Sequence, residues 1–135
     1  MTDKSYRVGL LVPSSNTTVE PEFYRALPAS VTLHTARMFL TDITPEAILR
    51  IVQDLESQSR LLATADVDVI VLACTNWRSM DSIEKLEREL GKPVLSTTQV
   101  SVWDALRIVG YRGEVAGYGR LLRTLGEKER IAAVA

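Results

Sequence analysis

Cysteine and histidine are scarce in this sequence, with one of each among 135 residues. A single cysteine cannot form an internal disulfide, so we expect the protein to work in the reducing cytoplasm. Structural zinc sites take four cysteine or histidine ligands, which excludes such a site here. The sequence therefore predicts no metal centre, and Cys74 is the one thiol available for chemistry.

Long apolar runs and excess charge are missing too. The longest largely apolar runs, such as residues 67–74, are far shorter than the about 20 residues that span a bilayer. The net charge is −1, so no overall field recruits nucleic acid or a membrane surface. Residues 1–7 are polar and lead into a strand pattern, from which we expect no signal peptide. These absences favour a cytoplasmic domain whose partner is a small molecule.

Short apolar runs alternate with helical patterns along the chain. Runs expected to form strands occupy residues 8–12, 31–36, 67–73 and 93–95, and residues 114–116 could form a short fifth strand. This alternation predicts βαβ units, with a parallel sheet and helices on both faces. We therefore expect an α/β fold of the flavodoxin type, a three-layer sandwich around a sheet of four or five parallel strands in the order 2-1-3-4(-5).

Helix starts are predicted by three local patterns. Thr17 with Glu20, and Asp81 with Glu84, have the spacing of a capping box. Thr44 stands directly before a proline, which suits the first position of a helix. We expect a helix to begin at each of these places.

Two loops follow neighbouring strands of the expected sheet, residues 13–18 (PSSNTT) and 74–79 (CTNWRS). Ligands of such sheets bind beyond the carboxyl ends of the strands, at the switch point, which lies here between the first and third strands. The hydroxyl, amide and backbone donors of Ser14, Ser15 and Asn16 predict an anion cradle in the first loop. The alternative is that this loop only makes a turn and caps a helix through a threonine.

Cys74 stands at the end of the most strand-like run of the chain. A cysteine in a donor-rich loop can react as a thiolate, and Thr75 and Asn76 can hold a carboxylate beside it. The alternative is a small buried hydrophobic residue, which most free cysteines are. We expect His34 to be structural, whereas Arg37 could reach an anion or lie on the surface.

Six segments of the sequence resemble one enzyme family: residues 8–23 (VGLLVPSSNTTVEPEF), 33–38 (LHTARM), 69–76 (VIVLACTN), 91–94 (GKPV), 103–106 (WDAL) and 117–122 (GYGRLL). They are similar to the maleate cis-trans isomerase and arylmalonate decarboxylase branch of the aspartate/glutamate racemase superfamily. The resemblance covers nearly the whole chain apart from its last dozen residues.

The chain departs from this family in length. Family members are about twice as long and consist of two similar α/β halves, with the active site in the cleft between them. Here the opening resembles the first half, the stretch from Cys74 resembles the second, and the middle segment is missing. We expect a single racemase-like half-domain at residues 1–124, a C-terminal tail at 125–135, and a homodimer that rebuilds the two-walled cleft.

The resemblance implies chemistry without a metal or organic cofactor. It assigns Cys74 as the catalytic residue and implies that Ser14, Ser15, Asn16, Thr75 and Asn76 bind a substrate carboxylate. The implied function is a cysteine-dependent isomerase, racemase or decarboxylase of a small (di)carboxylic acid. The alternatives are a non-catalytic family member that folds and binds small acids, and a flavin binder, although residues 13–18 lack the glycine expected of a phosphate loop.

Overall fold

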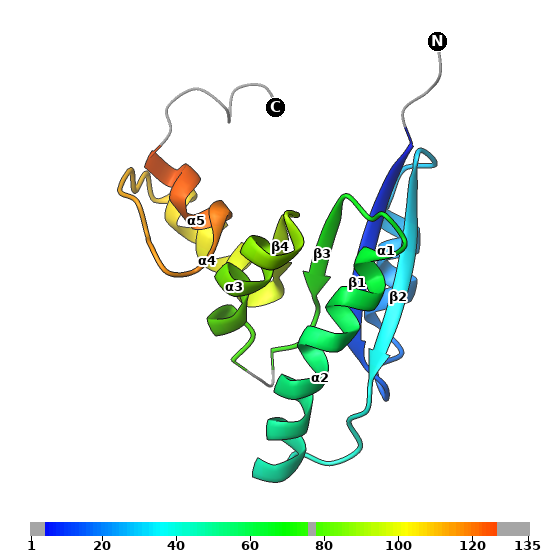
Figure 1. Ribbon diagram of the computed structural model, residues 1–135. Coiled ribbons are helices and arrows are strands. Elements are labelled where there is room, and N and C mark those ends of the chain that lie inside the picture. Colours follow the sequence, from blue (N-terminus) through cyan, green and yellow to red (C-terminus); the bar gives the residue numbers. More distant parts are fainter. Residues whose placement is uncertain (1–4, 76–77, 127–135) are drawn as a thin grey trace.

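The computed structural model describes residues 5–75 and 78–126 and contains one parallel sheet (Figure 1). Its strands are β1 (Tyr6–Pro13), β2 (Val31–Met38), β3 (Val69–Leu72) and β4 (Val94–Ser96). They pair in the order β2-β1-β3-β4, and every pair is parallel. The expected α/β fold and strand order are confirmed, and the switch point lies between β1 and β3.

Helices connect the strands and cover the sheet. They are α1 (Val19–Ala26), α2 (Pro45–Ala63), α3 (Met80–Leu90), α4 (Thr97–Ile108), the short α5 (Arg120–Arg123) and the 3-10 helix η1 (Thr124–Gly126). Within the described residues, none of these helices is long and apolar enough to cross a membrane.

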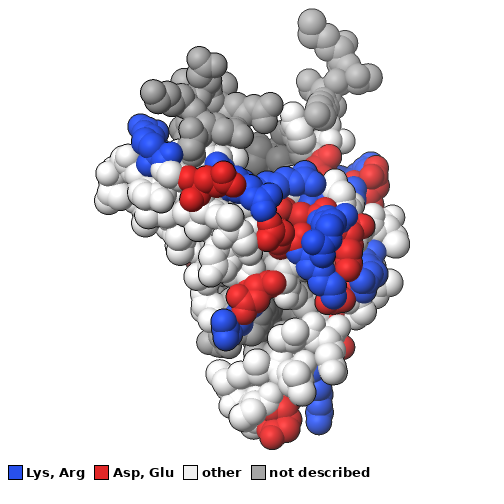
Figure 2. Space-filling model, turned by 60° about the vertical axis from the view of Figure 1, so that its left-hand side comes forward, with Lys and Arg blue, Asp and Glu red and all other residues white. Residues whose placement is uncertain are grey.

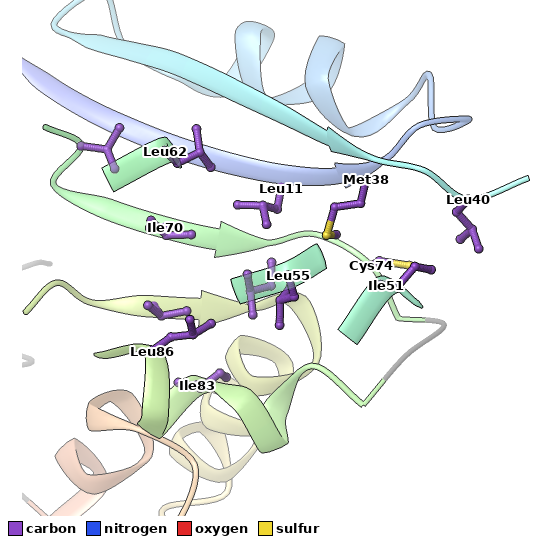
Figure 3. Close-up of a cluster of buried hydrophobic side chains, with 13 residues drawn as sticks. Leu11, Met38, Leu40, Ile51, Leu55, Leu62, Ile70, Cys74, Ile83 and Leu86 are labelled. Carbon is purple, nitrogen blue, oxygen red and sulfur yellow. The ribbon is translucent and has the colours of Figure 1, made fainter. Parts of the chain in front are cut away.

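The main core lies between the sheet and helices α2 and α3 (Figure 3). Leu11 and Ile70 are fully buried on this face of the sheet, where they meet Leu55 of α2 and Ile83 of α3. Leu10, the neighbour of Leu11, belongs to a second cluster on the other face, under α1. Successive strand residues point to opposite faces, so a central strand buried on both faces must be apolar throughout.

Of the four or five strands expected, the fifth does not form. Residues 114–116 form no strand, and Val115 N–H instead donates to the carbonyl oxygen of Leu122 (3.4 Å). β4 is only three residues long, so it offers little edge for a further strand. The segment after α4 therefore turns back toward α5 and does not extend the sheet.

A helix begins within two residues of each predicted start, but the predicted cap forms in one case out of three. Thr44 caps α2, with its hydroxyl accepting from Ala47 N–H (3.1 Å), as predicted. The capping boxes expected at Thr17 and Asp81 do not form, because α1 begins at Val19 and α3 at Met80. A complete capping box occurs at α4, between Ser96 and Gln99.

Two buried polar side chains attach the segment before α5 to the rest of the fold. Glu87 accepts from Val94 N–H (3.1 Å) and from Arg120 N–H (2.8 Å). Gln99 donates from Nε2 to the carbonyl oxygen of Tyr118 (2.7 Å). The chain then runs into η1, whose Leu125 is buried, and the rest of the predicted tail lies outside the described residues.

Candidate active site

A hollow of about 450 Å³ opens at the carboxyl ends of β1 and β3, where the two predicted loops meet. It is lined by Pro13, Ser15, Asn16, Val19, Leu40, Thr41, Ile43, Ala73, Cys74, Thr75 and Thr97. None of these residues is charged, so any anion held here is bound by neutral hydrogen-bond donors. A hollow large enough for a small ligand therefore lies at the predicted switch point.

Cys74 follows β3 and both lines the hollow and packs into the core. Its side chain belongs to the same buried cluster as Met38, Leu40 and Ile51, and it is 9% exposed (Figure 3). Packing on one side therefore fixes the position of the sulfur relative to the loop donors on the other. Cys74 is therefore a core residue that also lines the hollow.

Asn16 has a defined orientation in the first loop. Its Oδ1 accepts from the backbone N–H groups of Thr18 (3.0 Å) and Val19 (2.9 Å), which caps α1. This corrects the expectation that a threonine caps the helix, since the amide of Asn16 reaches the same N–H groups. Because two donors fix Oδ1 on the helix side, Nδ2 remains the donor that Asn16 can offer to a ligand in the hollow.

The two serines of the first loop behave differently. The Ser14 hydroxyl accepts from Leu40 N–H (2.9 Å), and Ser14 is not among the residues that line the hollow. Ser15 does line it, and its hydroxyl donates to the carbonyl oxygen of Leu40 (3.0 Å). Both serines thus tie the first loop to the segment after β2, and Ser15 also lines the hollow.

The second loop adds Thr75, which lines the hollow beside Cys74. Asn76, the other predicted carboxylate holder, lies outside the described residues. Thr97, the first residue of α4, lines the hollow as well and was missed from the sequence. Its buried hydroxyl oxygen has no hydrogen-bond partner within the described part of the chain. The Ser96–Gln99 capping-box spacing marks the start of α4 and could have drawn attention to it.

His34 and Arg37 of β2 do not line the hollow. His34 Nε2 lies 3.0 Å from the Thr32 hydroxyl, which fits its expected structural role. Arg37 forms an ion pair with Glu20 (3.0 Å) behind the first loop. Across residues 5–75 and 78–126, no three histidine, cysteine, aspartate or glutamate side chains lie close enough together to hold a metal ion.

The fold and the hollow define a class of protein: an α/β unit with a cysteine and uncharged polar side chains at its switch point. Residues 59–122 match the family model for arylmalonate decarboxylase. The arylmalonate decarboxylase of Bordetella bronchiseptica is 42% identical over 60 residues, which cover 44% of this chain and 25% of that protein.

Solved structures agree with these sequence matches. Unliganded arylmalonate decarboxylase is 30% identical, with a TM-score of 0.67 and coverage of 86% of this chain and 52% of that chain. A Nocardia farcinica maleate cis-trans isomerase mutant with a covalently bound succinylcysteine intermediate is 26% identical, with a TM-score of 0.60. The match covers 76% of this chain and 48% of that chain. The chain is therefore similar to maleate isomerases and arylmalonate decarboxylases in sequence and fold, and it spans about half the length of these solved relatives.

Proposed function

We propose that this chain is a cofactor-independent enzyme unit that uses Cys74 to act on a small (di)carboxylic acid, at carbon next to the carboxylate. The observation that carries the proposal is that Cys74 shares one hollow with Ser15, Asn16 and Thr75. A thiol and a set of neutral donors facing the same space are what this chemistry requires.

The donors act on the charge that develops during reaction. When a proton or carbon dioxide leaves the carbon beside a carboxylate, negative charge moves onto the carboxylate oxygens as an enediolate. Neutral donors that already point at those oxygens stabilise this charge more than they stabilise the ground state. Asn16 suits this task because its amide is fixed by two backbone contacts before a ligand binds.

Cys74 would then act on carbon. In a decarboxylation, carbon dioxide leaves, the S–H group gives its proton to the enediolate carbon, and water reprotonates the thiolate. In a racemisation, the Cys74 thiolate of one copy would take the substrate proton on one face, and the Cys74 thiol of the second copy in the proposed dimer would give a proton to the other face. In an isomerisation, the thiolate adds to the carbon–carbon double bond, the resulting single bond rotates, and the C–S bond breaks to restore the thiolate. The succinylcysteine intermediate of the Nocardia isomerase mutant supports the second course for that protein.

The second wall of the site would come from a symmetric homodimer. Two large apolar side chains at the edge of the open hollow are exposed: Ile43 (67%), which lines it, and Phe39 (68%), which precedes the lining residue Leu40. Figure 2 shows charged side chains gathered over one part of the surface, whereas the lower part is mostly uncharged. Exposed apolar side chains beside a half-open site, with Asp42, Glu46 and Arg50 close to Phe39, suit contact with a second copy across a twofold axis.

The test is turnover of maleate, aspartate and arylmalonates by the purified chain, compared with Cys74→Ala. We expect the wild-type chain to convert at least one of these acids, and Cys74→Ala to lose at least about a hundredfold, as expected for removal of a catalytic proton donor. Ser57→Ala is the matched control, because Ser57 is exposed on α2 and does not line the hollow. An active Cys74→Ala protein would overturn the proposal.

A wild-type protein that binds malonate without converting any of these acids would support the non-catalytic alternative. The dimer is tested separately, by light scattering for a mass near twice 15.0 kDa. A bifunctional maleimide tests whether two Cys74 thiols face one cleft. A monomer, or a dimer whose Cys74 thiols never join, would contradict the shared cleft.

A further inference from the structure

We propose that Arg37 is a positioning residue, which holds the first loop in the shape that binds a carboxylate from a place outside the hollow. This inference rests on the proposed function of the hollow. It assigns to Arg37 a role different from the two expected from the sequence, which were direct contact with an anion and simple surface exposure.

The geometry around Arg37 carries the inference. Its Nη1 donates to two carbonyl oxygens of the loop, those of Ser14 (3.1 Å) and Asn16 (2.8 Å). Its Nη2 donates to Oε2 of Glu20 (3.0 Å), in the first turn of α1. One guanidinium therefore joins β2, the loop and the helix that follows the loop.

These contacts determine which dipoles of the loop face a ligand. A carbonyl oxygen carries partial negative charge and would repel a bound carboxylate. The oxygens of Ser14 and Asn16 point to Arg37, which does not line the hollow, so their negative ends are drawn away from the anion. The same residue, Asn16, is fixed on its side chain by Thr18 and Val19, so both of its oxygens are held.

Glu20 keeps Arg37 in this orientation. The pKa of the Glu20 carboxyl lies below its ordinary value, and even an ordinary carboxyl is charged at neutral pH, so Glu20 meets Arg37 as a carboxylate (3.0 Å). A planar guanidinium can serve two carbonyls and a carboxylate at fixed angles, whereas a lysine ammonium is a compact point charge without this fork. Replacement of Arg37 by lysine therefore keeps the charge but loses the geometry.

The experiment compares Arg37→Lys with Arg7→Lys. Arg7 is a matched control because it also joins a carboxylate (Asp66, 3.2 Å) and a backbone carbonyl, but near the amino end of β1, away from the hollow. We expect Arg37→Lys to weaken binding of malonate, used as the probe, by about tenfold, the factor for a loss of 1.4 kcal/mol. Arg7→Lys should change the affinity for malonate by less than about twofold, as expected for an exposed ion pair.

Two further measurements separate positioning from general damage. In Arg37→Lys, hydrogen exchange at the amides of Thr18 and Val19 should speed up, while the rate of Cys74 alkylation stays at the wild-type value. Should Arg37→Lys fail to fold, Glu20→Gln keeps the guanidinium and its two carbonyl contacts and should show a smaller weakening of the same sign.

The inference is overturned if Arg37→Lys binds malonate as tightly as wild type, or if Arg7→Lys weakens it equally. A wild-type protein that binds no malonate would refute the proposed carboxylate site itself, and with it the binding role of Arg37. In that case the exchange rates at Thr18 and Val19 show whether Arg37 still holds the loop, so the two failures are distinguishable.

Discussion

Replacement of Gly119 by alanine tests how closely the segment before α5 is packed. Gly119 has φ 86 and ψ −176, a backbone region that is essentially restricted to glycine. A Cβ atom there would lie 2.5 Å from Cγ2 of Ile83 and 2.9 Å from Oε2 of Glu87. Both neighbours belong to α3 and are buried, so neither can move aside freely.

The expected cost has two parts. The backbone strain of a non-glycine residue at this position costs about 1–3 kcal/mol. Forcing a methyl group into a packed interior costs a further about 1–3 kcal/mol. Gly119→Ala should therefore lower the free energy of unfolding by about 2–6 kcal/mol, a large part of the total for a domain of this size.

Gly117→Ala separates the two parts. Gly117 has a similar φ of 91, but a Cβ atom there would meet nothing within 4 Å, so only the backbone strain applies. Urea denaturation followed by circular dichroism measures both variants, and we expect Gly119→Ala to be less stable than Gly117→Ala by about 1–3 kcal/mol. Equal losses in the two variants would refute the close approach to α3.

Two further predictions concern the start of α4 and the ion pair behind the first loop. Ser96→Ala should lower the free energy of unfolding by about 0.5–2 kcal/mol, because it removes the hydroxyl that accepts from Gln99 N–H (3.1 Å). Urea denaturation checks this against Ser57→Ala, and equal stabilities would contradict it. The lowered pKa of Glu20 means that its carboxylate stabilises the folded state above the unfolded pKa near 4.5, and that this contribution is lost as pH falls through the folded value. Stability measured between pH 7 and pH 3 should therefore fall less steeply in Glu20→Gln, whereas parallel curves would show that Glu20 contributes nothing.

Much of the fold could be predicted from the sequence because the central strands are buried on both faces. Leu10 and Leu11 pack into different clusters, so β1 forms a continuous apolar run in the sequence. Alternation with helices then determines parallel pairing and the switch point, and this is why Cys74 and Asn16 could be expected to meet at one hollow.

The local predictions that failed concern positions where several groups can make the same hydrogen bond. Asn16 and Thr17 can each cap α1, and only the path of the loop decides that the amide reaches the helix. Residues 114–116 have a strand-like composition, but the backbone of the following segment is bound by Gln99 and Glu87. These are long-range contacts between buried polar groups, which no local pattern indicates. Thr97 is a different case. The Ser96–Gln99 spacing of a capping box was present in the sequence and marks the start of α4 at Thr97, so a local pattern could have indicated it.

The attachment of the segment before α5 bears on how this protein can change through mutation. Gln99 and Glu87 bind backbone atoms of Tyr118 and Arg120, so the attachment does not depend on the side chains at these two positions. Tyr118 also borders a second hollow that Thr75 lines, next to the hollow of Cys74. Position 118 is therefore a place where side chains can vary beside the candidate site while the backbone path is retained, which makes it a natural starting point for changing substrate preference by directed evolution.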